Sequence, residues 1–329
     1  MTTNKKRLLV PQSMSPAAWA ILQARPDIDT IGFPATIQAR DLLALIQHHA
    51  PVQGIALGVT KFGDPELDAA QDMQVVARIG VGYDAVDVEA LTRRKIPLMV
   101  TDIANSPSVA EAALFMMMAL AKRGAEMDAM VRTNRWSERL RSPPYDLYGK
   151  TVLIVGFGRI GTRVAARCLA MEMSVLVYDP YRSAADISAA NCEPVTDLNA
   201  ATARADFITL HCPKTAETTD LFGAERLMRM KPSAYLINTA RGGIINEQAL
   251  FNALQQGQLA GAGLDVFDQE PTPIDNPLLA LPNVICAPHV AGVTREAYDR
   301  MAQQTAHNLL SVLDGAPSRI HVVNQIVLD

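Results

Sequence analysis

Short apolar runs alternate with helical patterns along the first hundred residues. The runs predict strands at positions 7–10, 54–59, 75–79 and 97–100. Between them, Ser15 is suited to cap a helix that starts at Pro16, and residues 88–94 also have helical spacing. Strands that alternate with helices in this way predict a parallel sheet covered by helices.

The same alternation continues through the second half of the chain. Apolar runs predict further strands at 151–155, 174–178, 207–211, 235–238, 263–266 and 284–287. Asn246 is suited to cap a helix that reaches Gln255, and Thr294 to start a long helix that runs to Leu313. Gly315 then allows a left-handed stop.

A different pattern lies between these two halves. Ser108 and Glu111 form a capping-box sequence, which predicts that a long helix begins at Ser108. Residues 112–121 are apolar on all sides of that helix and must be buried on several of them. We expect a core helix that links two domains, part of which could also face a second subunit. Residues 133–148 lack periodicity and are expected to form an extended connecting arm.

The sequence GFGRIG at 156–161 directly follows one apolar run, and Asp179 ends the next. Gly156 allows a tight turn from strand to helix, Gly158 lets a pyrophosphate approach the backbone, and Gly161 lets the helix pack closely on the strand. Asp179 would accept hydrogen bonds from the adenosine ribose, which favours NAD over NADP. Arg182 nearby could instead accommodate a phosphate, although a surface arginine is commonly only solvated.

Composition limits the remaining possibilities. The 329 residues are 49% apolar, enough for two packed cores, and about 150 residues precede the glycine motif. With 30 basic and 34 acidic residues, the net charge of −4 gives no sign of nucleic-acid binding or of an anionic membrane surface. The apolar core near the N-terminus is too short for a signal peptide, and no run is long enough to cross a bilayer. These features predict a cytoplasmic protein.

The four cysteines are far apart in the sequence. Their spacing matches neither a zinc site nor a disulfide framework, so we expect reduced thiols and no bound metal.

Three polar segments lie at or just after the ends of late strands, where open α/β sheets bind their ligands. They are NTARGG at 238–243, LDVFDQEP at 264–271 and APHVAG at 287–292, and they point to Arg241, Glu270 and His289. Taken singly, each residue could be structural: Arg241 could pair with an internal carboxylate, Glu270 could sit in a turn, and His289 could be a satisfied strand-end residue. Together with GVGYD at 80–84, the segments resemble the D-isomer-specific 2-hydroxyacid dehydrogenases, and the resemblance covers nearly the whole chain.

The resemblance implies a fold and a reaction. It implies two Rossmann- or flavodoxin-like doubly wound α/β domains, with an NAD-binding domain at 105–293 inserted into a discontinuous substrate domain at 1–104 and 294–329. The enzyme would interconvert a 2-keto acid and a D-2-hydroxy acid by hydride transfer, with NAD as cofactor. Arg241 would hold the substrate carboxylate and carbonyl, His289 would exchange the proton, and Glu270 would orient the imidazole.

Further binding residues follow from matching motifs. Backbone N–H groups near Val81 and Gly82 would approach the substrate carboxylate. The residues implied to line the cofactor, besides the three glycines and Asp179, are Arg159, Ile160, Cys212, Pro213, Thr239, Ala240 and Asp265. A homodimer through the cofactor domain is also expected.

The substrate is less well defined by the sequence. Arg78 matches a cation of the phosphoglycerate dehydrogenase subgroup, but Leu57 stands near the place where that subgroup commonly has another arginine. Because the chain ends at Asp329, we also expect it to lack the C-terminal regulatory domain that some members carry. We therefore expect a small substrate such as glyoxylate or hydroxypyruvate. The alternatives are a 3-phosphoglycerate dehydrogenase without a regulatory domain and an NAD-sensing protein that recruits partners.

Overall fold

The computed structural model describes residues 5–329 as two compact units. The first unit comprises Met1–Asn105 and Val293–Asp329, and the second comprises Ser106–Gly292. Met1 to Asn4, which begin the basic segment at the N-terminus, lie outside the described residues. Each unit has its own parallel sheet, so each is described by itself.

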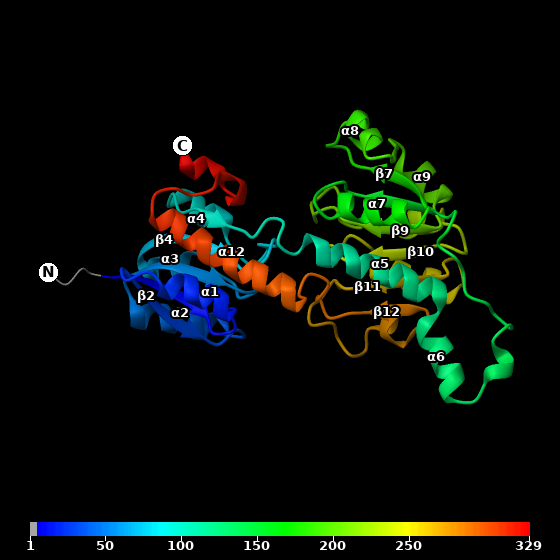
Figure 1. Cartoon of the computed structure of the whole chain (residues 1–329), viewed down its shortest axis with the longest axis horizontal. Helices are drawn as coiled ribbons and strands as arrows, with labels where there is room; N and C mark the ends of the chain where they lie inside the picture. The colour runs from blue at the N-terminus through cyan, green and yellow to red at the C-terminus, as the bar shows by residue number, and fades with distance from the viewer. Residues whose placement is uncertain (1–4) are drawn as a thin grey trace. The chain divides into compact units, whose positions relative to one another are not determined.

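The first unit contains a five-stranded parallel sheet in the order β2-β1-β3-β4-β5 (Figure 1). This is the flavodoxin-like order of a doubly wound sheet. Its strands are β1 (Lys6–Pro11), β2 (Ile28–Phe33), β3 (Val52–Leu57), β4 (Gln71–Arg78) and β5 (Leu98–Met99). Its helices are α1 (Pro16–Gln23), α2 (Ala39–His49), α3 (Asp64–Ala70), α4 (Val88–Arg93) and α12 (Arg295–Leu313), followed by the short 3-10 turns η3 (Arg319–His321) and η4 (Gln325–Leu328).

Alternate side chains of these strands enter two separate cores. Leu9 and Val76 pack with α2, α3 and α4, whereas Leu8 and Val75 pack with α1 and α12 on the opposite face. Helix α12 thus returns the C-terminal part of the chain to the sheet formed by the N-terminal part. The segment after α12 also covers the edge of β5, because Val100 N donates to His321 O over 2.8 Å.

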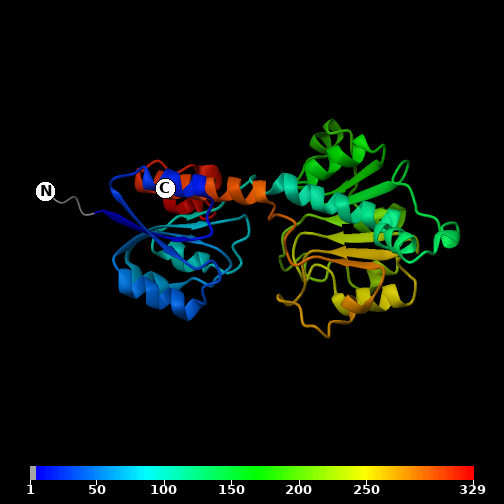
Figure 2. The same cartoon turned by 60° about the horizontal axis from the view of Figure 1, so that its bottom comes forward.

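The second unit contains a seven-stranded parallel sheet in the order β12-β11-β10-β9-β6-β7-β8. Strands of this sheet lie side by side in Figure 2. The two halves of this order diverge from β6, as in a Rossmann domain. Its strands are β6 (Thr151–Val155), β7 (Ser174–Tyr178), β8 (Glu193–Pro194), β9 (Phe207–Leu210), β10 (Tyr235–Asn238), β11 (Gly261–Leu264) and β12 (Val284–Cys286). Its helices and 3-10 turns are α5 (Ser106–Lys122), α6 (Gly124–Arg132), η1 (Trp136–Glu138), α7 (Gly161–Ala170), α8 (Ala184–Ala189), α9 (Leu198–Arg204), α10 (Ala224–Leu227), α11 (Glu247–Gln255) and η2 (Pro277–Ala280).

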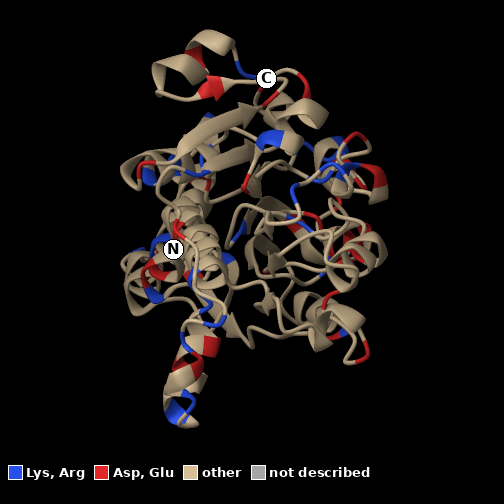
Figure 3. Cartoon of the chain, turned by 90° about the vertical axis from the view of Figure 1, so that its right-hand side faces the viewer, with Lys and Arg blue, Asp and Glu red and all other residues tan. Residues whose placement is uncertain are grey.

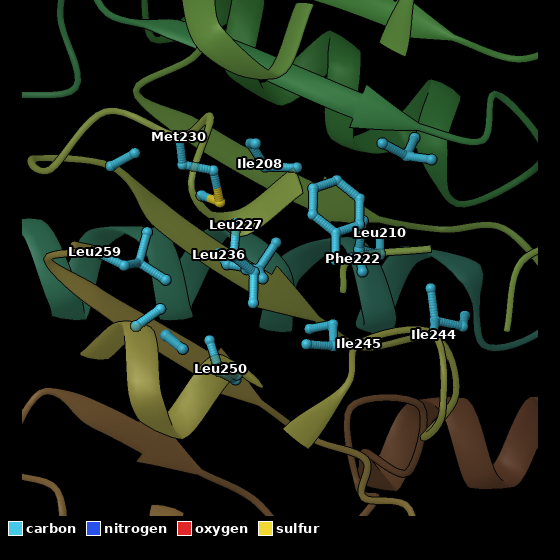
Figure 4. Close-up of a cluster of buried hydrophobic side chains, with 14 of the residues drawn as sticks. Ile208, Leu210, Phe222, Leu227, Met230, Leu236, Ile244, Ile245, Leu250 and Leu259 are labelled. Carbon is cyan, nitrogen blue, oxygen red and sulfur yellow. The ribbon is translucent and has the colours of Figure 1, made fainter. Parts of the chain in front are cut away.

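Helices cover both faces of this sheet as well. Helices α9, α10 and α11 pack on one face, where Leu236 of β10 meets Leu250 of α11 (Figure 4). Helices α5, α7 and α8 pack on the other face, where Val152 and Ile237 are fully buried. Lys and Arg are interspersed with Asp and Glu in the view of Figure 3. The doubly wound fold class expected from the sequence is confirmed.

Several sequence-based predictions are confirmed and one is wrong. Ser15, Asn246 and Thr294 cap their helices through side-chain acceptors. However, α5 begins at Ser106, so Ser108 lies inside the first turn and is not its cap. The physical reason is Pro107, whose fixed φ and missing N–H suit the first positions of a helix.

Helix α5 is buried on several sides, as expected, with Ala113, Met116 and Met117 in the core. On its outer side, Phe115 is 63% exposed and Met118 is also exposed. Part of the apolar surface of α5 thus remains uncovered within one chain. No helix in residues 5–329 is both long and apolar enough to cross a membrane.

Candidate active site

The three polar segments found in the sequence follow three neighbouring strands of the second unit. Arg241 follows β10, Glu270 lies in the loop after β11, and His289 lies just after β12. These strands are adjacent and parallel, so their carboxyl ends share one edge of the sheet. That edge is where open α/β sheets bind ligands.

Glu270 and His289 form a direct pair. The Glu270 Oε2 atom lies 2.7 Å from His289 Nδ1, and Glu270 Oε1 accepts the backbone N–H of Phe267 over 3.1 Å. Both carboxylate oxygens are thus in use, which fixes the carboxylate against its own loop. The His289 side chain remains 47% exposed. Because Nδ1 faces the carboxylate, Nε2 is the nitrogen that can face a substrate.

The Arg241 loop is held by the last residue of β10. Asn238 is buried, and its Oδ1 accepts the backbone N–H of Ala240 over 3.0 Å, while its Nδ2 donates to Arg241 O over 2.9 Å. The Arg241 guanidinium donates to Ala240 O over 2.7 Å. Asn238 therefore sets the path of the backbone from which the guanidinium extends.

Gly242 brings the Arg241 loop against the Glu270 loop. A Cβ atom at position 242 would lie 1.9 Å from Phe267 O and 2.8 Å from Asp268 N. No side chain fits at that approach. The glycine therefore allows the two loops to touch backbone to backbone.

The His289 turn has unusual backbone geometry. His289 has a φ of 55°, in the left-handed region, and its N–H donates to Asp265 O over 2.8 Å. A non-glycine residue in a sparsely populated region costs about 1–3 kcal/mol and persists only where neighbours hold it. Asp265 is 1% exposed and accepts the next two N–H groups, from Val290 and Ala291. Burial raises the pKa of the Asp265 carboxyl, and the two N–H donors oppose that rise.

The glycine motif forms a tight turn between β6 and α7. Gly156 has a φ of 97°, and a Cβ at Gly161 would lie 2.0 Å from Gly156 O. A Cβ at Gly158, in contrast, would meet no atom within 4 Å. The turn is thus closed toward the sheet and open outward at Gly158, which fits a pyrophosphate approaching the start of α7.

Asp179 closes this turn from the end of β7. Its Oδ2 accepts the N–H of Phe157 over 2.7 Å, and its Oδ1 accepts the N–H of Tyr181 over 2.8 Å. The carboxylate is therefore fixed beside the glycine turn, where an adenosine ribose would bind in a Rossmann domain.

The other residues implied to bind the cofactor lie at the carboxyl edge of the same sheet. Arg159 and Ile160 directly precede α7, Cys212 and Pro213 follow β9, and Thr239 and Ala240 follow β10. Burial raises the pKa of the Cys212 thiol to about 11, so the thiol stays protonated near neutral pH. The Thr239 hydroxyl is buried and has no hydrogen-bond partner within the described chain, so it has hydrogen-bonding capacity for a bound group.

Arg78, Val81 and Gly82 belong to the first unit. Arg78 ends β4, is only 8% exposed, and donates from Nε to Gly82 O over 2.7 Å and from Nη1 to Leu57 O over 2.9 Å. Its guanidinium thus supports the backbone of the loop that contains Val81 and Gly82.

Sequence reasoning missed two residues that shape this site. Asn238 and Gly242 were noticed only as parts of a motif, although each fixes the Arg241 loop. The available signals were a polar residue at the end of an apolar strand and two consecutive glycines. Across residues 5–329, no group of three or more His, Cys, Asp or Glu side chains could hold a metal ion.

Comparison with known proteins identifies the family. Residues 114–291 match the family model described as D-isomer specific 2-hydroxyacid dehydrogenase, NAD binding domain. The chain belongs to this family. It is accordingly an oxidoreductase of CH–OH donors with the NAD-binding domain of the 2-hydroxyacid dehydrogenases.

Two groups of relatives resemble this 2-hydroxyacid dehydrogenase. A glyoxylate reductase of Korarchaeum cryptofilum is 41% identical over 252 residues, which are 76% of this chain and 76% of the relative. A D-3-phosphoglycerate dehydrogenase of Archaeoglobus fulgidus is 38% identical over 260 residues, which are 79% of this chain and 49% of the relative. The chain thus spans about half the length of that second relative.

Solved structures agree over nearly the whole chain. A protein of Thermus thermophilus superposes with a TM-score of 0.86 at 34% identity, covering 96% of this chain and 99% of the other. A glyoxylate reductase from Paecilomyes thermophila gives a TM-score of 0.85 at 26% identity, covering 97% and 98%. The fold of both units is therefore that of the 2-hydroxyacid dehydrogenases.

Proposed function

We propose that this enzyme reduces a small 2-keto acid, such as glyoxylate or hydroxypyruvate, to the D-2-hydroxy acid with NADH. The observation that supports the chemistry is the 2.7 Å contact between Glu270 and His289 at the carboxyl edge of the second sheet. The observation that favours a small substrate is the burial of Arg78 against two backbone carbonyls. A phosphate would need cations that reach outward, and Leu57 supplies none.

The proposed division of work uses three side chains. Arg241 binds the carboxylate and the carbonyl oxygen of the keto acid through its planar guanidinium. Bound NADH supplies the hydride for the carbonyl carbon. His289 donates the proton from Nε2 to the carbonyl oxygen, and it accepts that proton in the reverse direction. Glu270 accepts from Nδ1 and so orients the ring, which leaves Nε2 for the substrate.

The domain roles are part of the same proposal. The second unit would bind NAD through Gly156, Gly158, Gly161 and Asp179, and the first would present the loop of Val81 and Gly82 to the substrate carboxylate. The glycine turn supports the first assignment, because it is open outward at Gly158. The small residues of the loop support the second assignment, because they let a ligand come close to backbone N–H groups.

A panel of keto acids tests the substrate. NADH oxidation would be followed with glyoxylate, hydroxypyruvate and pyruvate, and NAD reduction with 3-phosphoglycerate. We expect kcat/KM to be highest for glyoxylate or hydroxypyruvate. A higher value for 3-phosphoglycerate would favour the phosphoglycerate dehydrogenase alternative. Tight NADH binding without any turnover would favour the NAD-sensing alternative and defeat the enzymatic proposal.

We also propose a homodimer through the second unit. Phe115 and Met118 of α5 are exposed apolar side chains, as are Trp136 of η1 and Leu140 and Tyr148 in the segment before β6. Apolar side chains gathered on one unit suit contact with a second copy. Sedimentation should show a dimer that Phe115→Glu converts to a monomer. Ile326→Glu, at a similarly exposed position in the first unit, should leave the dimer intact.

We also propose, from its cysteines, that the protein is located in a reducing cellular compartment. Cys168, Cys192, Cys212 and Cys286 are all free thiols. Persistent thiols are typical of the cytoplasm. Fractionation of cells that contain the protein would test this location.

A further inference from the structure

The first two residues of the turn at 289–291 are exposed, and its contacts besides the His289–Glu270 pair come from its backbone. The His289 and Val290 side chains are both exposed, so apolar packing contributes little to the position of either residue. The backbone of His289 is nevertheless in the left-handed region at a φ of 55°. A backbone in this region persists only where neighbours hold it, so the contacts of the turn's backbone matter.

Asp265 lies beneath that turn and makes three contacts with it. Its backbone oxygen accepts the N–H of His289 over 2.8 Å. Its Oδ1 accepts the N–H of Val290 over 2.8 Å, and its Oδ2 accepts the N–H of Ala291 over 2.9 Å. Three consecutive backbone donors thus converge on one residue.

A carboxylate is the side chain that suits this position. Consecutive N–H groups in a turn form a concavity that binds an anion. An aspartate offers one charged acceptor oxygen to each donor, whereas an asparagine would turn an amide donor toward one of them. Within residues 5–329 no lysine or arginine forms an ion pair with Asp265, so these backbone donors compensate its buried charge.

Asp265 is itself well anchored. It directly follows β11, and its backbone N–H donates to Asn238 O over 3.0 Å. The same Asn238 holds the Arg241 loop through its side chain. The position of Asp265 is therefore fixed by the sheet and not by the exposed loops.

We propose that Asp265 is a positioning residue that holds the imidazole of His289 by binding the backbone of the turn at 289–291. This inference rests on the proposed role of His289 as the proton donor. It differs from the role expected for Asp265 from family resemblance, which is contact with the nicotinamide amide. Both roles require the carboxylate, so the experiments must separate them.

The variant Asp265→Asn separates the two roles. It should lower kcat by about 10- to 100-fold, because small displacements of a reacting group cost rates of this order. The NADH dissociation constant should stay within about threefold of wild type. Asp275→Asn is the matched control, because Asp275 is exposed and lies in the same segment after β11. It should leave kcat within about twofold of wild type.

A cofactor analogue and a double mutant add readouts that general loosening of the fold would not change. The 3-acetylpyridine analogue of NAD lacks the amide N–H that a carboxylate would bind. Discrimination between NAD and this analogue should be the same in wild type and Asp265→Asn. The double variant Asp265→Asn/His289→Asn should lose no more than about threefold relative to His289→Asn alone, since residues acting through one another are not additive.

Opposite outcomes would overturn the proposal. Asp265 would be assigned to the cofactor if the two substitutions lowered kcat multiplicatively in the double variant. The same conclusion would follow if Asp265→Asn bound NADH more weakly and no longer discriminated between NAD and the analogue. Should Asp265→Asn fail to fold, amide exchange in the wild-type enzyme decides: the N–H of Val290, whose side chain is exposed, should exchange slowly. Fast exchange of the Val290 N–H would refute the proposed hydrogen bond to Asp265 even in an active enzyme. Absence of turnover with slow exchange would instead refute only the role of His289.

Discussion

The Glu270 carboxylate bridges His289 Nδ1 at 2.7 Å and the Phe267 backbone N–H at 3.1 Å. The imidazole is thereby tied to a backbone segment that also contacts Gly242. Glu270→Gln keeps the size of the side chain, but it leaves an amide donor facing either the ring or the Phe267 N–H. We expect kcat to fall by about 10- to 100-fold. NADH binding, measured by fluorescence titration, should not change.

A neighbouring substitution provides the control for Glu270→Gln. Gln269 is exposed and adjacent in sequence. Gln269→Ala should therefore leave kcat within about twofold, since surface changes of this kind have small effects. If Glu270→Gln retained more than half of wild-type kcat, Glu270 would not orient the proton donor.

Gly242→Ala should separate the two loops that bear Arg241 and Glu270. The added methyl would lie 1.9 Å from Phe267 O, a backbone atom that cannot rotate away. We expect the free energy of unfolding to fall by about 1–3 kcal/mol. We also expect kcat/KM for the keto acid to fall by about tenfold or more, because Arg241 is displaced. Thermal unfolding and steady-state kinetics measure the two effects.

Gly124→Ala is the control for steric crowding. Gly124 begins α6, and a Cβ there would meet no atom within 4 Å. Alanine favours a helix over glycine, so this variant should be as stable as wild type or slightly more stable. Equal behaviour of the two variants would mean that the approach at Gly242 has no functional importance.

The hydrophobic pattern predicts most of this fold, and its failures have physical causes. Helix α12 is predicted from Thr294 to Leu313, with its cap, because local capping and periodicity agree there. Strand β2 was not predicted, because Asp29, Thr30 and Gly32 interrupt its apolar pattern and only its two ends are buried. For α5, the sequence predicted burial on several sides but left open what covers the outer side, because composition shows that a face is apolar and not what covers it.

The candidate site was also predicted only in part. Arg241, Glu270 and His289 are found from motifs, because their side-chain chemistry is distinctive and they follow predicted strands. The residues that hold these side chains in place are harder to find from the sequence. Asp265 and Ala291 are joined across 26 positions, and nothing in either sequence segment specifies that bond. Gly242 is visible as a glycine, but only the folded chain shows that Phe267 lies against it.

Asp179→Ala should weaken the preference for NADH over NADPH. The carboxylate is fixed by the N–H groups of Phe157 and Tyr181, so it cannot turn away from a 2′-phosphate. Its removal should lower the ratio of kcat/KM for NADH to that for NADPH by about tenfold, or ~1.4 kcal/mol of discrimination. NADH should also bind less tightly, because the glycine turn loses an acceptor.

Asp186→Ala serves as the control for the charge change at Asp179. Asp186 is exposed on α8, in the segment that follows the same strand. Its removal should leave the cofactor ratio unchanged. If Asp179→Ala also left the ratio unchanged, the carboxylate would not read the ribose.

His211 should make the fold sensitive to acid. The residue follows β9, its Nε2 lies 2.9 Å from Thr209 Oγ1, and its Nδ1 is buried without a partner among the described residues. Burial lowers the pKa of the His211 imidazole from 6.5 to about 3. The folded chain therefore keeps the ring neutral where the unfolded chain protonates it.

The direction of the pH effect follows from this difference. Below pH 6.5 the unfolded chain binds the proton, so the free energy of unfolding falls as pH is lowered from 6.5 toward 3. The loss should be on the order of 2–3 kcal/mol between pH 7 and pH 4.

His211→Gln removes the titrating ring, so its unfolding free energy, measured with denaturant at each pH, should fall less steeply than that of wild type. His307→Gln, at an exposed position on α12, should keep the wild-type slope. Equal slopes for wild type and His211→Gln would show that the ring is protonated as readily in the folded chain as in the unfolded one.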